Sequence, residues 1–210
     1  MKTDELIASL AARPVPPPMR AGRLGLALLS AMVAAAALFL AVAGPRDGLP
    51  GLLAQPLIAA KTLLPVLTSL IALPALVALF YPEGWISRPL RLALPLAVAA
   101  ALWGFSFAAL PDQARFAEFT PFAIVECVGL ILVIAVLPLW AALRLAARGA
   151  PTRPALTGAM AGLVVGSGAA AGYSFFCLQD NPLFYVTWYG TAIALTMIAG
   201  AWLGARRLRW

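Results

Sequence analysis

The two cysteines, the only ones in the chain, are the side chains best suited to chemistry. Cys127 lies about two turns into one long apolar run and Cys177 directly follows another, so we expect both thiols at similar depth near one membrane face. In an oxidising compartment such a pair can form a disulfide, and as thiolates it can bind a soft metal ion. A buried cysteine is also a common small packing residue, so both interpretations stay open.

Three ionisable side chains are expected near the cysteines, where they would support a sensor. Lys61 and Glu126 lie inside apolar runs at comparable depth, and Asp180 follows Cys177. A charge in the hydrocarbon region finds either a partner or water, so the sequence predicts either a Lys61–Glu126 ion pair or snorkelling of each side chain to the interface. Two thiolates are too few for structural zinc, but a soft metal ion could use them with Glu126 or Asp180.

The remaining inventory of reactive residues is small. The chain has no histidine, which removes the commonest general base and imidazole ligation of metals. It also has no phosphate-binding glycine loop and no nucleophile elbow. We therefore expect no enzymatic activity and no required cofactor, with a transient soft metal ion at Cys127 and Cys177 as the one candidate ligand.

The composition is that of an integral membrane protein. Hydrophobic residues make up 63% of the chain and charged residues 11%, which excludes an ordinary soluble domain. Six apolar runs are each long enough to cross a hydrocarbon layer about 30 Å thick as a helix. They cover residues 24–43, 57–80, 92–110, 121–143, 155–176 and 185–204. The predicted fold class is therefore all-α, a bundle of six transmembrane helices.

Most of the fifteen Lys and Arg residues lie in alternate connections between these runs. They concentrate in residues 1–23, 81–91, 144–154 and 205–210, and they are sparse in the other connections. Positive residues stay in the cytoplasm during insertion, so both termini are predicted to be cytoplasmic. The net charge of +7 thus anchors helix ends, and we expect contact with membrane lipid and no direct contact with nucleic acid.

The predicted domains are a cytoplasmic tail over residues 1–23, a transmembrane domain over 24–204 and a basic cytoplasmic C-terminus over 205–210. Residues 3–11 of the tail predict a short helix that ends before Pro14. The expected partner-binding residues are two acids in its first turn and three apolar side chains on one face: Asp4, Glu5, Leu6, Ile7 and Leu10. A protein partner is favoured over the membrane surface, because a membrane-lying helix usually carries more basic residues.

Glycines at four-residue spacing predict close helix packing. They form one face of the fifth run and one face of the sixth, and their members are Gly158, Gly162, Gly166, Gly200 and Gly204. Small residues repeated once per turn let two helix backbones approach closely inside a membrane. Packing within the chain is the simpler interpretation, and a dimer contact is the alternative, so the oligomeric state is left open.

Three stretches resemble the NrsF-like family of bacterial six-helix membrane anti-sigma factors. They are the opening residues 1–15, the loop from Cys177 through Asp180 to Trp188-Tyr189-Gly190, and the ending Gly204 with Arg206-Arg207-Leu208-Arg209-Trp210. The resemblance implies a protein of the bacterial inner membrane that sequesters an extracytoplasmic-function sigma factor. It also implies release of that partner on metal or oxidative stress sensed through Cys127 and Cys177.

The residues after Cys177 differ from the family pattern, and a different function is also open. Relatives commonly carry a proline and an additional acid after the second cysteine, where this chain has Leu178 and Gln179. The missing acid weakens metal binding more than thiol–disulfide chemistry. From the residues alone, a small membrane transporter or an accessory subunit of a membrane complex is the alternative function, with Lys61 and Glu126 as its polar groups.

Overall fold

The computed structural model describes residues 3–12, 20–49, 51, 54–86 and 90–208. The part of the chain described is helical without strands, which confirms the predicted class. Six of its helices are long and apolar enough to cross a membrane, so the chain is a multi-pass membrane protein. They are α2 (Ala21–Ala43), α4 (Pro56–Ala78), α5 (Leu90–Ala109), α7 (Pro121–Ala146), α8 (Pro154–Ser174) and α9 (Pro182–Arg207).

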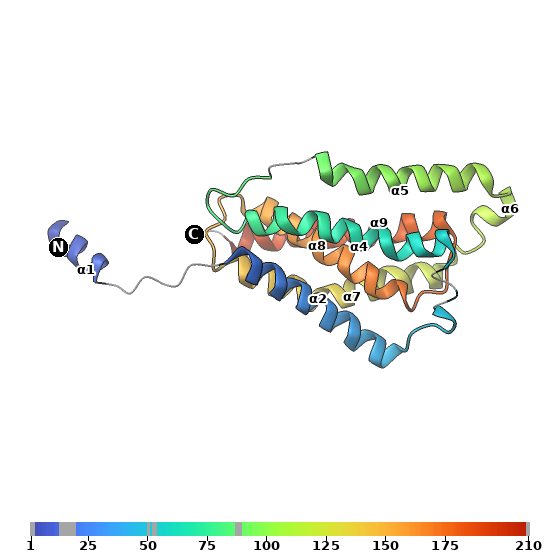
Figure 1. Cartoon of the computed structure of the whole chain (residues 1–210), viewed down its shortest axis with the longest axis horizontal. Helices are drawn as coiled ribbons and strands as arrows, with labels where there is room; N and C mark the ends of the chain where they lie inside the picture. The colour runs from blue at the N-terminus through green and yellow to red at the C-terminus, as the bar shows by residue number, and fades with distance from the viewer. Residues whose placement is uncertain (1–2, 13–19, 50, 52–53, 87–89, 209–210) are drawn as a thin grey trace.

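Two shorter helices flank or join these spans. In the tail, α1 (Thr3–Ala11) has the predicted bounds and lies apart from the bundle in Figure 1. Between α5 and α7, α6 (Asp112–Arg115) is a single turn that the hydropathy pattern does not predict. The spans begin within a few residues of the predicted runs, and α7, α8 and α9 each begin at a proline. Proline suits this position because its missing N–H has no partner in the first turn of a helix.

Successive spans run in opposite directions, so the bundle has two distinct ends (Figure 1). The start of α2 and the end of α9 lie at the same end, together with the loops around residues 82–86 and 147–153. We call this the basic end, because most of the arginines lie there. The opposite end carries the connections 44–55, 110–120 and 175–181, and we call it the cysteine end.

The most buried helix, α8, packs against α2, α4, α7 and α9. Its composition explains this position, because glycine, alanine and serine dominate it and allow neighbours to come close. In contrast, α5 packs mainly against α4 and α9 and exposes most of its surface. Between α5 and that pair lies an apolar cavity of about 370 Å³, with Pro65 and Pro95 on opposite walls.

The glycines of α8 and α9 form the closest contact in the bundle. Gly158 lies against the backbone of Gly200 and Gly204, and Gly162 lies against the backbone at Thr196. A Cβ atom at Gly158 would overlap with the carbonyl oxygen of Gly200. This face is therefore used within the chain, and the other glycines of α8, Gly168 and Gly172, face α2 instead.

Gly158→Ala should destabilise the bundle, because the added methyl group forces α8 and α9 apart. Overpacking of this kind typically costs about 1–3 kcal/mol. Gly129→Ala in α7 is the matched control, because nothing lies within 4 Å of its Cβ position. Alanine favours a helix over glycine by about 1 kcal/mol, so the control should be neutral or stabilising. Unfolding by SDS titration in mixed micelles measures both, and equal stability of the two variants would contradict the close contact.

Candidate functional site

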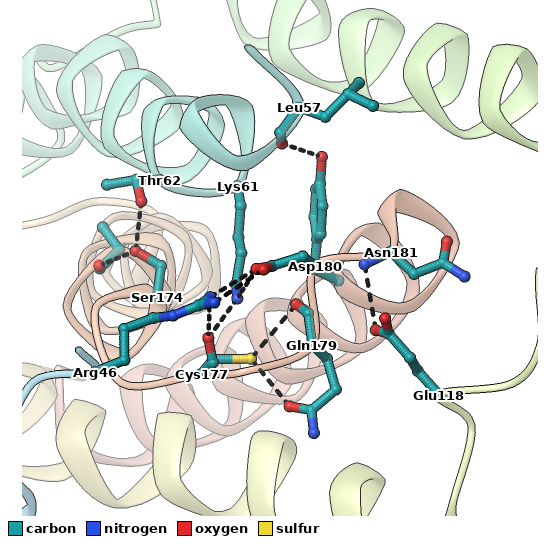
Figure 2. Close-up of polar contacts among 12 residues, drawn as sticks. Arg46, Leu57, Lys61, Thr62, Glu118, Ser174, Cys177, Gln179, Asp180 and Asn181 are labelled. Carbon is teal, nitrogen blue, oxygen red and sulfur yellow. Dashed lines mark hydrogen bonds and ion pairs between the residues drawn. The ribbon is translucent and has the colours of Figure 1, made fainter. Parts of the chain in front are cut away.

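The loop after α8 is held in place by an arginine that lies far from it in the sequence. Arg46, in the α2–α4 connection, donates two hydrogen bonds to the Asp180 carboxylate, at 2.7 Å and 2.9 Å. It donates a third to the carbonyl oxygen of Cys177 at 2.9 Å (Figure 2). Its backbone N–H donates to the Phe175 carbonyl oxygen at 2.9 Å. A bidentate arginine–carboxylate contact fixes orientation as well as distance. The loop therefore has one defined position over the cysteine end.

The second cation in the site is Lys61. Its side chain is only 1% exposed, and its Nζ donates to the Cys177 carbonyl at 2.7 Å and to Asp180 at 3.2 Å. Arg46 and Lys61 thus share one carboxylate and one carbonyl oxygen, as Figure 2 shows. An isolated buried ammonium group would be very unfavourable, so Lys61 requires this loop in place.

The predicted Lys61–Glu126 ion pair is wrong, because Lys61 pairs with Asp180. The two residues lie at similar depth, but α8 packs against both α4 and α7 and separates them. Glu126 is half-buried and lines a cavity of about 240 Å³ that it shares with Arg46 and Gln179. It therefore lies beside the loop without joining the cluster of Arg46, Lys61 and Asp180.

The charges around Asp180 shift its protonation equilibrium. Burial alone would raise the pKa of this carboxyl group, but hydrogen bonds from Arg46 and the nearby charge of Lys61 outweigh burial and hold its pKa below the ordinary value. The same contact raises the pKa of Arg46 further above its already high value. Asp180 and Arg46 are therefore both charged at neutral pH.

The two thiols are free and buried in the same apolar cluster. The Cys177 sulfur donates to the side-chain oxygen of Gln179 at 3.3 Å, while Cys127 lies on α7 among apolar neighbours. The buried hydroxyl groups of Tyr173 and Tyr189 lie near Cys177.

Asn181 connects the loop 175–181 to the connection between α5 and α7. Its side-chain amide donates to the carbonyl oxygens of Ala114 and Arg115, and its backbone N–H donates to Glu118 at 3.2 Å. Its side-chain oxygen accepts from the N–H of Leu183 and so caps α9. The loop 175–181 is thus tied to the connections before α4 and before α7.

The structure brings together only some of the residues predicted to act in sensing or binding. Cys127, Cys177, Lys61 and Asp180 gather at the cysteine end, with Glu126 beside them. The tail residues Asp4, Glu5 and Ile7 are exposed on α1, and the side chains of Leu6 and Leu10 lie outside the described part. Sequence reasoning missed Arg46 and Asn181, although Arg46 is the single basic residue in its connection.

The side chains at the cysteine end offer few donor groups for a metal ion. Among the described residues, no group of three or more Cys, Asp or Glu side chains is placed to hold a metal ion. The carboxylate of Asp180 is already engaged by Arg46 and Lys61. The donor set that remains is the two sulfurs, which suits a disulfide or a two-coordinate soft ion better than a four-coordinate ion.

Comparison with known proteins identifies the family. The family described as "Negative regulator of sigma F" matches residues 9–210. The chain is 31% identical to a probable anti-sigma-F factor NrsF of Azospira oryzae and 32% identical to the anti-sigma-F factor NrsF of Caulobacter vibrioides. Both matches cover the whole of each chain. No solved structure matches. The chain therefore belongs to the NrsF family of negative regulators of sigma F.

Asp180→Asn should destabilise the protein at neutral pH, because it leaves Lys61 and Arg46 without their counter-charge. Breaking a buried ion pair in this way typically costs about 3–5 kcal/mol. Since the pKa of Asp180 is lowered by folding, the stabilisation is present above the unfolded value near 4 and is lost as the pH falls through the folded value. The difference in stability between parent and variant should therefore narrow as the pH falls below about 4.

The measurement is unfolding by SDS titration between pH 7 and pH 3. Asp112→Asn is the matched control, because Asp112 is exposed and pairs only with Arg115 within one turn. Exposed pairs contribute about 0–1 kcal/mol, so this variant should follow the parent at every pH. An Asp180→Asn protein as stable as the parent at pH 7 would show that the cluster does not hold the loop.

Proposed function

We propose that this chain is an anti-sigma factor of the bacterial inner membrane that holds an extracytoplasmic-function sigma factor at the membrane and releases it on oxidative stress. The family match over nearly the whole chain supports the anti-sigma role. The observation that carries the sensing role is the buried pair of free thiols, one of them in the loop bound by Arg46 and Lys61. The two parts of the proposal are tested separately below.

The orientation follows from charge. With the basic end in the cytoplasm, the arginines of residues 20–23, 144–153 and 206–207 stay on the side where insertion leaves them. Both termini then face the cytoplasm, where a sigma factor is found. The cysteine end faces the oxidising side of the membrane, where thiols meet oxidants.

The sigma-factor contact is assigned to α1 together with the loops of the basic end. Ile7 is 59% exposed, and Asp4 and Glu5 are exposed in the first turn. A helix of nine residues is marginal in isolation and becomes stable when its apolar face is covered. A partner with an apolar groove rimmed by basic residues fits this helix.

The sensing step is oxidation of the thiol pair. An organic or hydrogen peroxide transfers an oxygen atom to one thiolate, which gives a sulfenic acid and an alcohol or water. The second thiol attacks that sulfur, the S–S bond forms and water leaves. Because Cys177 supplies both the reacting sulfur and the carbonyl oxygen that binds the two cations, movement of this residue toward Cys127 strains the contacts of the loop.

The signal has a direct route to the other end of the bundle. The loop that contains Cys177 follows α8 directly, and α8 begins at the basic end at Pro154. Its glycine face allows α8 to move along α9 with backbone in contact, which is how packed helices shift between two arrangements. The sigma factor must bind one of the two arrangements more tightly, because otherwise oxidation releases nothing.

Two other interpretations have less support. A soft metal ion bridging Cys127 and Cys177 would produce a similar shift and remains the second candidate stimulus. The transporter alternative needs a polar path, whereas Lys61 is neutralised by Asp180 and the cavity that it borders has an apolar lining. We therefore do not propose transport.

Replacing Leu6, Ile7 and Leu10 together by Asp should abolish co-purification of the sigma factor, because three charges cannot enter an apolar groove. Each buried apolar side chain contributes about 1.5–3 kcal/mol, so at least a hundredfold loss of affinity is expected. Ala8→Asp with Ala12→Asp is the control, because Ala8 lies on the opposite face of α1 and Ala12, just beyond the helix, donates its N–H to the Ala8 carbonyl. Co-purification from the native host, with partners identified by mass spectrometry, measures the effect. Retention of the sigma factor by the triple variant would move the contact to the loops.

Cys127→Ala and Cys177→Ala should each block release of the sigma factor by peroxide without changing repression at rest. Either change removes one half of the disulfide, while alanine keeps the site apolar and small. Sigma-dependent transcription before and after peroxide measures the response, and maleimide labelling counts the remaining thiols. If both variants respond like the parent, the sensing assignment is wrong while the anti-sigma role stands.

A further inference from the structure

A groove at the basic end is formed by α7 and α9. It has a volume of about 630 Å³ and is lined along its length by residues 132–147 of α7 and 196–207 of α9. Most of its lining is apolar, as in Val136, Leu139 and Leu203. Fifteen residues of helix span about 22 Å. One leaflet of a bilayer, from the midplane through the headgroups, is about 20–22 Å thick, so the groove is one leaflet long.

Two arginines from different helices lie at the mouth of this groove. Arg144 comes from the last turn of α7 and Arg207 from the last turn of α9, and both line it. Neither forms an ion pair with a carboxylate of the described residues. The Arg144 guanidinium lies 4.8 Å from the centre of the Trp140 ring, and Trp140 also lines the groove. This contact holds the Arg144 charge beside the opening.

We propose that the groove is a binding site for an anionic phospholipid of the leaflet at the basic end. One acyl chain occupies the apolar groove between α7 and α9. The phosphate lies between Arg144 and Arg207 and accepts hydrogen bonds from both guanidinium groups. Charge complementarity identifies the headgroup, and the apolar lining and length of the groove identify the acyl chain.

A lipid fits this groove better than a protein helix does. Two positive charges at its mouth, neither paired with a carboxylate among the described residues, favour a ligand that is negative at one end and apolar along the rest. A basic pocket between helices at the cytoplasmic surface is the arrangement that recognises anionic headgroups. The proposal needs only the transmembrane bundle, so it does not depend on the sigma factor or on the cysteines.

The other arginines of these two helix ends provide matched controls. Arg206 follows Trp202 on α9, with its guanidinium 3.9 Å from the centre of that ring, and Arg148 lies just beyond the end of α7. Neither lines the groove. A double change at Arg144 and Arg207 therefore removes the same charge from the same helix ends as a double change at Arg148 and Arg206. Only the first removes charge from the groove.

The test is native mass spectrometry of the full chain purified in mild detergent and titrated with palmitoyl-oleoyl phosphatidylglycerol or phosphatidylcholine. The parent should retain one phosphatidylglycerol molecule at concentrations where it retains no phosphatidylcholine. Arg144→Gln with Arg207→Gln should weaken phosphatidylglycerol binding at least tenfold, and Arg148→Gln with Arg206→Gln less than twofold. Ala199→Trp, which fills the groove from α9, should abolish retention while leaving all four arginines in place.

Three outcomes would overturn the proposal. If both double arginine variants weakened phosphatidylglycerol binding equally, anionic lipid would be attracted to the basic end in general and not to the groove. Equal retention of both lipids by the parent would show that the groove binds an acyl chain without selecting the headgroup. Full retention in Ala199→Trp would place the lipid elsewhere. Gel filtration and SDS titration of each variant establish that it is folded, so that a loss of lipid reports on binding.

Discussion

The arrangement of the cysteine end depends on the burial of Lys61. A lysine with 1% exposure inside an apolar helix cannot remain there without an opposite charge and hydrogen-bond acceptors. Asp180 and the Cys177 carbonyl provide both, and Arg46 binds the same carboxylate through two hydrogen bonds. This requirement brings the end of α2, the start of α4 and the connection between α8 and α9 to one point. Asn181 then joins the connection before α7 to the same loop.

The two ends of the bundle differ in how their polar and charged groups are satisfied. At the cysteine end the polar groups satisfy one another inside the protein, and the thiols lie beneath them. At the basic end most arginines point outward, and several lie over tryptophan rings, as Arg144 does over Trp140 and Arg206 over Trp202. Between the ends, α8 and α9 meet through glycine backbone without large side chains.

Hydropathy and charge were enough to predict the helical class and the six spans, because a membrane span must satisfy its backbone internally over a fixed length. The partner of Lys61 was not predictable in the same way. Depth along each helix follows from sequence, but which helices are neighbours depends on side-chain packing, and the alanine- and glycine-rich α8 took the place between α4 and α7. Arg46 was missed for a related reason, since its partner lies 134 residues away and no local pattern marks it. The groove between α7 and α9 likewise exists only in the assembled bundle.

The separation between Lys61 and Asp180 has a consequence for how the chain is made. Lys61 belongs to the second span, and its counter-charge lies 119 residues later, beyond the fifth. At a synthesis rate of about 5–20 residues per second, Lys61 enters the membrane roughly 6–24 s before Asp180 exists. During that interval the ammonium group has to be shielded by water or by the insertion machinery. The contact between Lys61 and Asp180 therefore forms only after the fifth span has been synthesised.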